Sequence, residues 1–287
     1  MPIKIIADSS CDLSTAQARA LGIDLVKVPF TLQLGESIYI DNEEMDVAEY
    51  VRQMNAYPKC PKTAAPSPQC YLDTFTGDCD IYVVTISSKL SASYQNAIVA
   101  QDAYLEEHPE GFVHVFDSRS ASAGVVLAIM KIQEEYDRGS AREELIENVT
   151  RFIGRHRTYF LLEQMDNLVK AGRLSPIALK LATVLNICPV LGNTADGYTR
   201  IVEKVRGKSK VLKRLVAIML KDGADQKEKI LTICHVNNLK KALCLKEEVM
   251  KCMEFKDILI FEARGLVANY AQEFGIVLSF SPESVLR

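Results

Sequence analysis

Four serines lie between an apolar run and a stretch that favours a helix, and hydroxyl groups at such a point can bind an anion. The run Ile81–Ile86 is continuous and largely β-branched, which is typical of a strand buried on both faces. Residues 94–104 favour a helix. The serines between them are Ser87, Ser88, Ser91 and Ser93. Because a strand end and a helix start present free N–H groups, the stretch predicts an anion site. The plainer interpretation is that Ser91 or Ser93 only caps the helix.

Two further predicted strands also end in polar residues. Ile3–Ala7 precedes Asp8-Ser9-Ser10, and Phe112–Phe116 precedes Asp117-Ser118-Arg119-Ser120. The carboxyl ends of parallel strands meet at one edge of a sheet. We therefore expect these residues and the four serines to form one polar edge.

The composition indicates an ordinary soluble globular protein. The chain has 287 residues, of which 48% are hydrophobic and 25% charged, and its formal net charge is −3. A prior of roughly 150 residues per domain predicts two domains or one large one. The pI of about 5.9 and the lack of a long basic cluster argue against a nucleic-acid partner. No apolar run reaches the roughly 18 residues that cross a bilayer, so no transmembrane segment is expected.

The cysteines and the N-terminal residues predict a cytoplasmic protein. The sequence begins without the layout of a signal peptide, and its eight cysteines include no C-x-x-C pair. They are therefore expected to be reduced thiols. Cys60, Cys70 and Cys79 are spaced too widely for a zinc knuckle. We expect neither a metal site nor a cofactor.

The predicted elements change in character after Thr158. Up to that point strands alternate with helices, including a helix over 142–155 that Ser140 is expected to cap. Beyond it, two strands flank Asp196-Gly197, which is a strong signal for a hairpin, and a helix is expected over 176–185.

These patterns predict an α/β protein with two domains. Residues 1–158 are expected to form an N-terminal α/β domain around a parallel sheet, and residues 159–287 a C-terminal mixed α+β domain. The segment 58–68 holds four prolines in eleven residues. It is predicted to be an ordered loop without regular structure.

Several segments together resemble the DegV family. Thr63-Ala64-Ala65-Pro66-Ser67 is similar to its T-S-x-P-S loop, and residues 86–97 follow its I-S-S-x-L-S-G-T-Y-Q-x-A pattern almost position for position. The other matches occur in the family's order and reach from residue 3 to about 210: Asp8–Leu13, Asp117–Ser120, Ala171–Ser175 and Asp196–Lys208. Each match is weak alone, but the set is specific.

The resemblance implies a non-catalytic protein that buries a long-chain fatty acid, such as palmitate, in a tunnel between its two domains. Such proteins present the carboxylate of the fatty acid to a separate ATP-dependent fatty acid kinase, which makes an acyl-phosphate. The family's carboxylate-binding hydroxyls correspond to Thr63 and Ser91. Secondary candidates for the same site are Ser87, Ser88, Ser93, Arg173 and Tyr270.

The chain departs from the family pattern near its C-terminus. Many members carry H-x-G-P-G, whose histidine also contacts the carboxylate, whereas residues 262–275 here contain no histidine. The chain therefore resembles a branch that lacks the motif. Tyr270 or Asn269 could supply the missing donor, and a Tyr270 that only packs in the core is the alternative. Ala64 and Ala92 also replace the usual Ser and Gly.

Two other functions remain open. The first is an acyl hydrolase or transferase that uses Ser91 as nucleophile, which requires a general base within hydrogen-bond reach. Only Lys89, Asp8 and Asp117 are candidates for that base, because the four histidines are scattered. The second is a protein-interaction module whose cavity is a packing defect.

Overall fold

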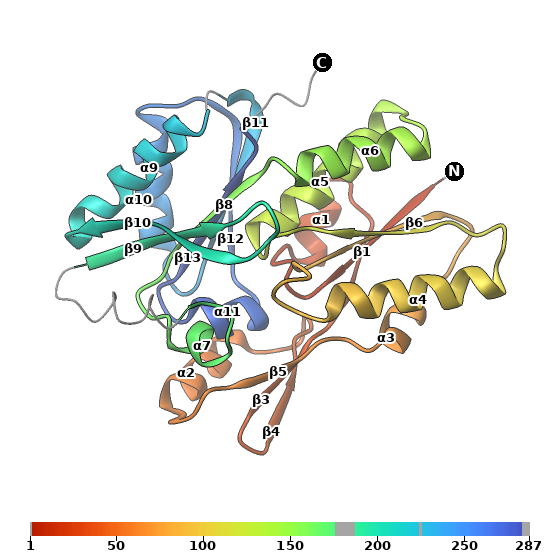
Figure 1. Ribbon diagram of the computed structural model, residues 1–287, viewed down its shortest axis with the longest axis horizontal. Coiled ribbons are helices and arrows are strands. Elements are labelled where there is room, and N and C mark those ends of the chain that lie inside the picture. The colour runs from red at the N-terminus through yellow and green to blue at the C-terminus, as the bar shows by residue number, and fades with distance from the viewer. Residues whose placement is uncertain (1, 176–186, 224–225, 283–287) are drawn as a thin grey trace.

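The computed structural model describes residues 2–175, 187–223 and 226–282, and it contains two main β-sheets (Figure 1). The first sheet has four parallel strands in the order β2-β1-β6-β7. Its strands are β1 (Ile3–Asp8), β2 (Leu25–Val28), β6 (Asp80–Thr85) and β7 (Val113–Asp117). The helices of this part of the chain are α1 (Thr15–Ala20), α2 (Val47–Ala56), α3 (Pro68–Leu72), α4 (Ser93–Glu107), α5 (Ala123–Arg138) and α6 (Arg142–Ile153).

Both faces of the parallel sheet are covered. Ile6 and Val83 pack with Tyr71 of α3 and Ala97 of α4, in one hydrophobic cluster. The alternate residues of the same strands, such as Tyr82, belong to the cluster that contains α5. All six residues of β6 are buried, which explains why the run Ile81–Val84 within it is apolar instead of alternating.

The second sheet is mixed and has six strands in the order β10-β9-β8-β13-β11-β12. Among the strands that the structure describes in this sheet, only β11 and β12 are parallel neighbours. Its strands are β8 (Arg157–Leu161), β9 (Ile187–Asn193), β10 (Thr199–Arg206), β11 (Gln226–His235), β12 (Phe255–Glu262) and β13 (Ile276–Phe280). Its helices are α7 (Asp166–Lys170), α9 (Val211–Lys221), α10 (Leu239–Met250) and α11 (Gly265–Ala271), with a 3-10 turn at Lys208–Lys210.

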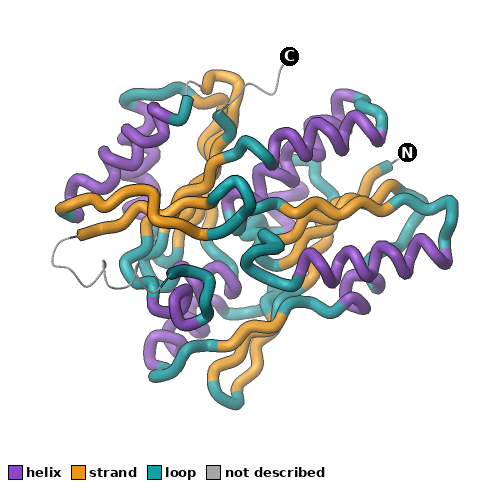
Figure 2. Tube along the Cα trace, viewed as in Figure 1, coloured by secondary structure: helices purple, strands orange, loops and turns teal. Residues whose placement is uncertain are grey.

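Helix α5 joins the two sheets. It contacts β6 of the first sheet and β11 and β13 of the second, while α9 and α10 pack with residues of the second sheet in a separate cluster. Figure 2 shows the two groups of strands with helices around each. We call the chain up to α6 the N-terminal half and the chain from β8 onward the C-terminal half. The predicted α/β class, with a parallel first sheet and a mixed second sheet, is confirmed.

A small third sheet corrects the prediction for the proline-rich segment. Lys62–Ala64 forms strand β5, which pairs with β3 (Thr31–Leu34), and β3 pairs with β4 (Ser37–Ile40). The prediction of no regular structure was therefore wrong for four residues, the three of β5 and Pro68, which begins α3. Prolines exclude a central strand, but β5 lies at the edge of its sheet and carries no proline itself.

The predicted cap at Ser140 was wrong, and of the alternative caps Ser91 and Ser93 the structure contradicts Ser93. Helix α6 begins after Ala141, and the Ser140 hydroxyl donates instead to Glu135 at 2.8 Å. Ser93 is the first residue of α4 and does not cap it, whereas Ser91 accepts one hydrogen bond from the Ser93 N–H.

The Asp196-Gly197 hairpin is confirmed by the antiparallel pair β9–β10. The helix predicted over 176–185 lies outside the described residues, and the boundary at residues 158 and 159 stays a prediction. Among the residues described, no helix is long and apolar enough to cross a membrane.

Candidate functional site

A cavity of about 220 Å³ lies between the two halves. Its walls are mainly aliphatic and aromatic, with hydroxyl groups and one guanidinium among them. The described residues that line it come from the N-terminal half (Phe30, Thr63, Ala65, Ile86, Leu90, Ser91, Ala92, Ala121, Ser122) and from the C-terminal half (Phe160, Leu162, Leu168, Arg173, Thr199, Leu266, Val267, Tyr270, Ala271, Val277). An apolar cavity with a few polar groups suits an amphipathic ligand.

Thr63, Ser91 and Tyr270 all lie on the wall of this cavity. Thr63 is on β5, opposite Leu32 of β3, and its Oγ1 lies 2.8 Å from the phenol oxygen of Tyr270 on α11. Ser91 precedes α4 and accepts a hydrogen bond from the Ser93 N–H at 3.2 Å. Three hydroxyl groups from separate parts of the sequence therefore line one cavity.

A side-chain contact ties the Thr63 segment to the Ser91 segment. Asn96, in the first turn of α4, donates from its amide nitrogen to the Pro66 carbonyl at 2.7 Å. Because Ser91 lies just before the same helix, this bond links the positions of Thr63 and Ser91.

Arg173 is exposed and extends across the two halves. Its Nε donates to the Leu90 carbonyl at 3.0 Å, and another guanidinium nitrogen donates to the carbonyl of Ala171. The guanidinium therefore lies beside the Ser91 loop and adds a positive charge to the cavity wall.

The hydroxyl groups of Ser87 and Ser93 are engaged away from the cavity. Ser87 Oγ donates to the Gly197 carbonyl at 2.9 Å, and Ser93 Oγ donates to Asp8 at 2.6 Å. Ser88, half-buried, binds Asp117 through its backbone N–H. None of the three lines the cavity among the described residues, and their role as secondary ligand groups stays a prediction.

The predicted polar edge exists, and Asp8 is at its centre. The carboxylate accepts hydrogen bonds from the Ile86 N–H at 2.9 Å and from the hydroxyls of Ser10 and Ser93. Burial raises the pKa of Asp8, while these hydrogen bonds oppose that effect. The network fixes the loop that carries Ser91.

No general base contacts Ser91 among the described residues. The three candidates from the sequence are held elsewhere: Asp8 by the contacts above, Asp117 by the N–H groups of Ser88 and Arg119, and the Lys89 ammonium over the Tyr198 ring at 5.7 Å. A serine nucleophile needs a base within hydrogen-bond reach, so these contacts do not support Ser91 as a nucleophile.

Sequence reasoning missed most of the lining residues, and Phe30 and Ser122 are two examples. Phe30 follows Pro29 in the link between β2 and β3, and nothing in the local sequence points to a cavity. Ser122 has a φ of +57°, which a serine rarely adopts, and its hydroxyl donates to Asp12. No local signal in the sequence predicts that backbone geometry.

A second hollow, of about 460 Å³, is larger but differs in chemistry. Its lining includes Lys131, Glu134, Asp137, Glu228 and Lys256. The charges of both signs make it a poor match for an apolar ligand. In the part of the chain that the structure describes, no group of His, Cys, Asp or Glu is arranged to hold a metal ion.

Comparison with known proteins adds independent information. The sequence model of the DegV family, described as uncharacterised proteins, matches residues 2–279. A DegV domain-containing protein of Streptococcus pneumoniae (strain ATCC BAA-255 / R6) is 33% identical over 280 residues, which are 98% of this chain and 99% of that protein.

Three solved structures are similar over nearly their whole length. The fatty acid kinase (Fak) B3 protein of Streptococcus pneumoniae, loaded with linoleic acid, has a TM-score of 0.90 and 32% identity, covering 99% of this chain and 100% of that one. A DegV family protein of Ruminococcus gnavus with vaccenic acid has a TM-score of 0.89 and 32% identity, and the match covers 96% of this chain and 99% of that one. A DegV family protein of Eubacterium eligens with heptadecanoic acid has a TM-score of 0.91 and 28% identity, and the match covers 98% of this chain and 100% of that one.

Proposed function

The chain belongs to the DegV family, and from this premise we propose that it binds a long-chain fatty acid in the cavity between its two halves. The observation that carries the proposal is the cavity itself, which has apolar walls and the hydroxyls of Thr63, Ser91 and Tyr270. Relatives with 28–32% identity and the same fold hold linoleic, vaccenic or heptadecanoic acid. Palmitate is a ligand of the same class.

Burial of the acyl chain supplies most of the affinity in this proposal. Transfer of a chain of about 15 methylenes out of water gains on the order of 12 kcal/mol, at about 0.8 kcal/mol each, before the costs of association. Phe30, Phe160 and Leu266 are among the side chains that would contact it. The head group then needs only a few donors to fix its orientation.

Thr63 and Ser91 are the proposed ligands of the carboxylate. Both offer O–H donors on the cavity wall, and Tyr270 lies within hydrogen-bond distance of Thr63. Tyr270 therefore supports the view that a phenol takes the place of the histidine that this chain lacks. Arg173, on the same wall, adds positive charge that favours the ionised head group.

The protein then acts as a carrier that presents the carboxylate to a partner kinase in the cytoplasm. The similar Fak B3 protein is named for a fatty acid kinase system. The arrangement around Ser91 supports transfer chemistry on a separate enzyme, because Asp8, Asp117 and Lys89 are bound to other groups. A kinase would supply ATP and the phosphoryl-transfer groups.

Native mass spectrometry tests the proposed function. Protein purified from bacterial cells is expected to carry a mass increment that matches a long-chain fatty acid, and delipidated protein is expected to take up palmitate in equal amount. Protein that is purified without a bound fatty acid, and that takes up none when it is added, would overturn the proposal. Acyl-ester hydrolysis that is lost in Ser91→Ala but kept in Thr63→Val would instead favour the hydrolase.

A further inference from the structure

Helix α11 forms one wall of the cavity although it is only seven residues long. Leu266, Val267, Tyr270 and Ala271 all line the cavity. A helix this short is not stable alone, so its position depends on contacts with the rest of the protein. The residue before it, Arg264, makes no side-chain cap.

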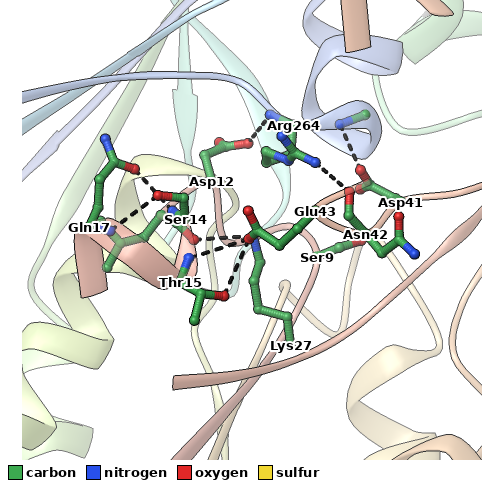
Figure 3. A network of polar contacts seen from close by, with 12 residues as sticks. Ser9, Asp12, Ser14, Thr15, Gln17, Lys27, Asp41, Asn42, Glu43 and Arg264 are labelled. Atoms are coloured by element: carbon green, nitrogen blue, oxygen red, sulfur yellow. Dashed lines mark hydrogen bonds and ion pairs between the residues drawn. The ribbon is translucent and has the colours of Figure 1, made fainter. Parts of the chain in front are cut away.

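Two buried carboxylates from the N-terminal half hold the start of this helix (Figure 3). Asp41 accepts the N–H of Gly265 at 2.8 Å and the N–H of Leu266 at 2.9 Å, one on each oxygen. Asp12 accepts the N–H of Arg264 at 2.6 Å. The free N–H groups at the start of α11 are thus satisfied by residues more than 220 positions away in the sequence.

Asp12 also contacts a second part of the cavity wall. Its second oxygen accepts hydrogen bonds from the Ser122 hydroxyl and, at 3.2 Å, from the Cys234 thiol. Ser122 lines the cavity. The Asp12 carboxylate therefore connects two segments of wall that come from different halves of the chain.

Gly265 is required for this approach. A Cβ at this position would lie 2.7 Å from the Asp41 carboxylate and 2.8 Å from Leu32. Both distances are shorter than van der Waals contact, and both neighbours are buried. Only glycine allows the backbone of α11 to reach Asp41.

Neither carboxylate has a cationic partner in direct contact among the described residues, although both are at least 98% buried. Burial of an unpaired carboxylate is costly, and it raises the pKa of both Asp12 and Asp41. The positive charge of Lys27 acts on both carboxylates, but its ammonium pairs with Glu43 and donates to the Leu13 carbonyl. The contacts that offset the cost are those with α11 and the cavity wall and, for Asp41, the hydroxyl of Ser9.

We propose that Asp41, with Asp12, is a positioning residue that fixes α11 and thereby sets how long a fatty acid stays in the cavity. This inference rests on the proposed function. The start of the helix that carries Tyr270 is held by the N-terminal half, while Asn167 of α7 holds its other end through the Asn269 carbonyl. Loss of the hydrogen bonds from Gly265 and Leu266 to Asp41 lets α11 shift. The shift opens a path for the acyl chain and moves the Tyr270 phenol away from Thr63.

The first test measures amide hydrogen exchange of residues 264–271 in the ligand-free full chain. Exchange is expected to be slow in the wild type, faster in Asp41→Asn and fastest in Asp41→Ala, because asparagine keeps one of the two acceptors. Gly265→Ala tests the same contact from the side of the helix. Asp80→Asn is the matched control, since Asp80 is also a buried carboxylate but pairs with Arg142, far from α11 in the fold.

The second test measures dissociation of a fluorescent long-chain fatty acid from the same variants. Loss of a hydrogen bond to a charged group predicts roughly a tenfold or greater increase in the dissociation rate for Asp41→Ala, with a smaller change in the association rate. Asp80→Asn should lower stability without this increase.

The outcomes separate the two proposals. Faster exchange together with faster dissociation supports the inference. Unchanged exchange at 264–271 in both Asp41 variants and in Gly265→Ala would overturn it, as would faster exchange with an unchanged dissociation rate. If the wild type takes up no fatty acid, the proposed function fails, and the exchange data still decide whether Asp41 holds α11.

Discussion

At the scale of single residues, two hydroxyl groups should decide how tightly a carboxylate is held. Thr63→Val and Ser91→Ala each remove one donor from the cavity wall. Loss of a hydrogen bond to a charged group costs about 1.5–3 kcal/mol, so each change should weaken palmitate binding roughly tenfold or more. Titration calorimetry on delipidated protein measures the effect.

Ser88→Ala is the matched comparison for these variants, and it also tests the secondary assignment of Ser88. Ser88 is a half-buried serine of the same loop whose side chain does not line the cavity. Its loss should leave the affinity within about twofold, because a residue away from the ligand changes little. Unchanged affinity in both Thr63→Val and Ser91→Ala would reject the assignment of the carboxylate ligands.

A second residue-scale prediction concerns pH. Burial raises the pKa of Asp12 to about 6, whereas an unfolded aspartate titrates at about 3.9. The folded state therefore binds this proton more tightly, so the contribution of Asp12 to stability is full below about pH 4 and is lost as the pH rises through 6. This difference in the pKa of Asp12 corresponds to a change in the free energy of unfolding on the order of 3 kcal/mol.

Urea unfolding at pH 5 and pH 7 tests whether the contribution of Asp12 to stability falls as the pH rises. On lowering the pH, the wild type should gain stability relative to Asp12→Asn, which cannot titrate at this position. The comparison with the variant cancels the carboxylates whose pKa is lowered, such as Glu163 beside Lys208 and Lys241. A difference between the two proteins that is independent of pH would show that Asp12 keeps an ordinary pKa.

At the scale of elements, the hydrogen bond from Asn96 to Pro66 joins α4 to the segment that follows β5. Asn96→Ala should lower the free energy of unfolding by about 1 kcal/mol, since one neutral hydrogen bond is lost. It should also weaken fatty-acid binding several-fold, although Asn96 does not line the cavity. Thermal unfolding and the same titration measure both effects. Lower stability with unchanged affinity would show that the Thr63 segment keeps its place without this bond.

The elements also show what the sequence can and cannot predict. The buried strand β6 was predicted from its continuous apolar run, because both of its faces are covered. Strand β5 was missed because the prolines around it argue against regular structure, and only its partner β3 makes it a strand. Thr63 and Ser91 were predicted as site residues from their places in sequence motifs. The role of Asp41 left no local signal, since its partners lie 224 and 225 positions further along the chain.

At the scale of the whole molecule, the two halves meet on several sides of the cavity. Arg173 contacts the Leu90 carbonyl, and Ser87 donates to the carbonyl of Gly197 at the turn of the β9–β10 hairpin. Asp12 and Asp41 hold α11. Because these contacts come from separate segments, the cavity exists only when both halves are folded against each other.

Gly197→Ala tests this dependence at the hairpin. Gly197 has a φ of +92°, and a Cβ there would lie 2.2 Å from Ser87 Oγ and 3.0 Å from the Arg119 backbone. Alanine should therefore displace the hairpin from the Ser87 loop and cost about 1–3 kcal/mol of stability. Gly172→Ala is the control for the conformational cost alone, because Gly172 has a φ of +73° with nothing within 4 Å of a Cβ. Denaturant unfolding of both variants should show the larger loss for Gly197→Ala, together with faster release of fatty acid. Equal losses in the two variants would mean that the hairpin contact contributes nothing beyond the backbone conformation of its glycine.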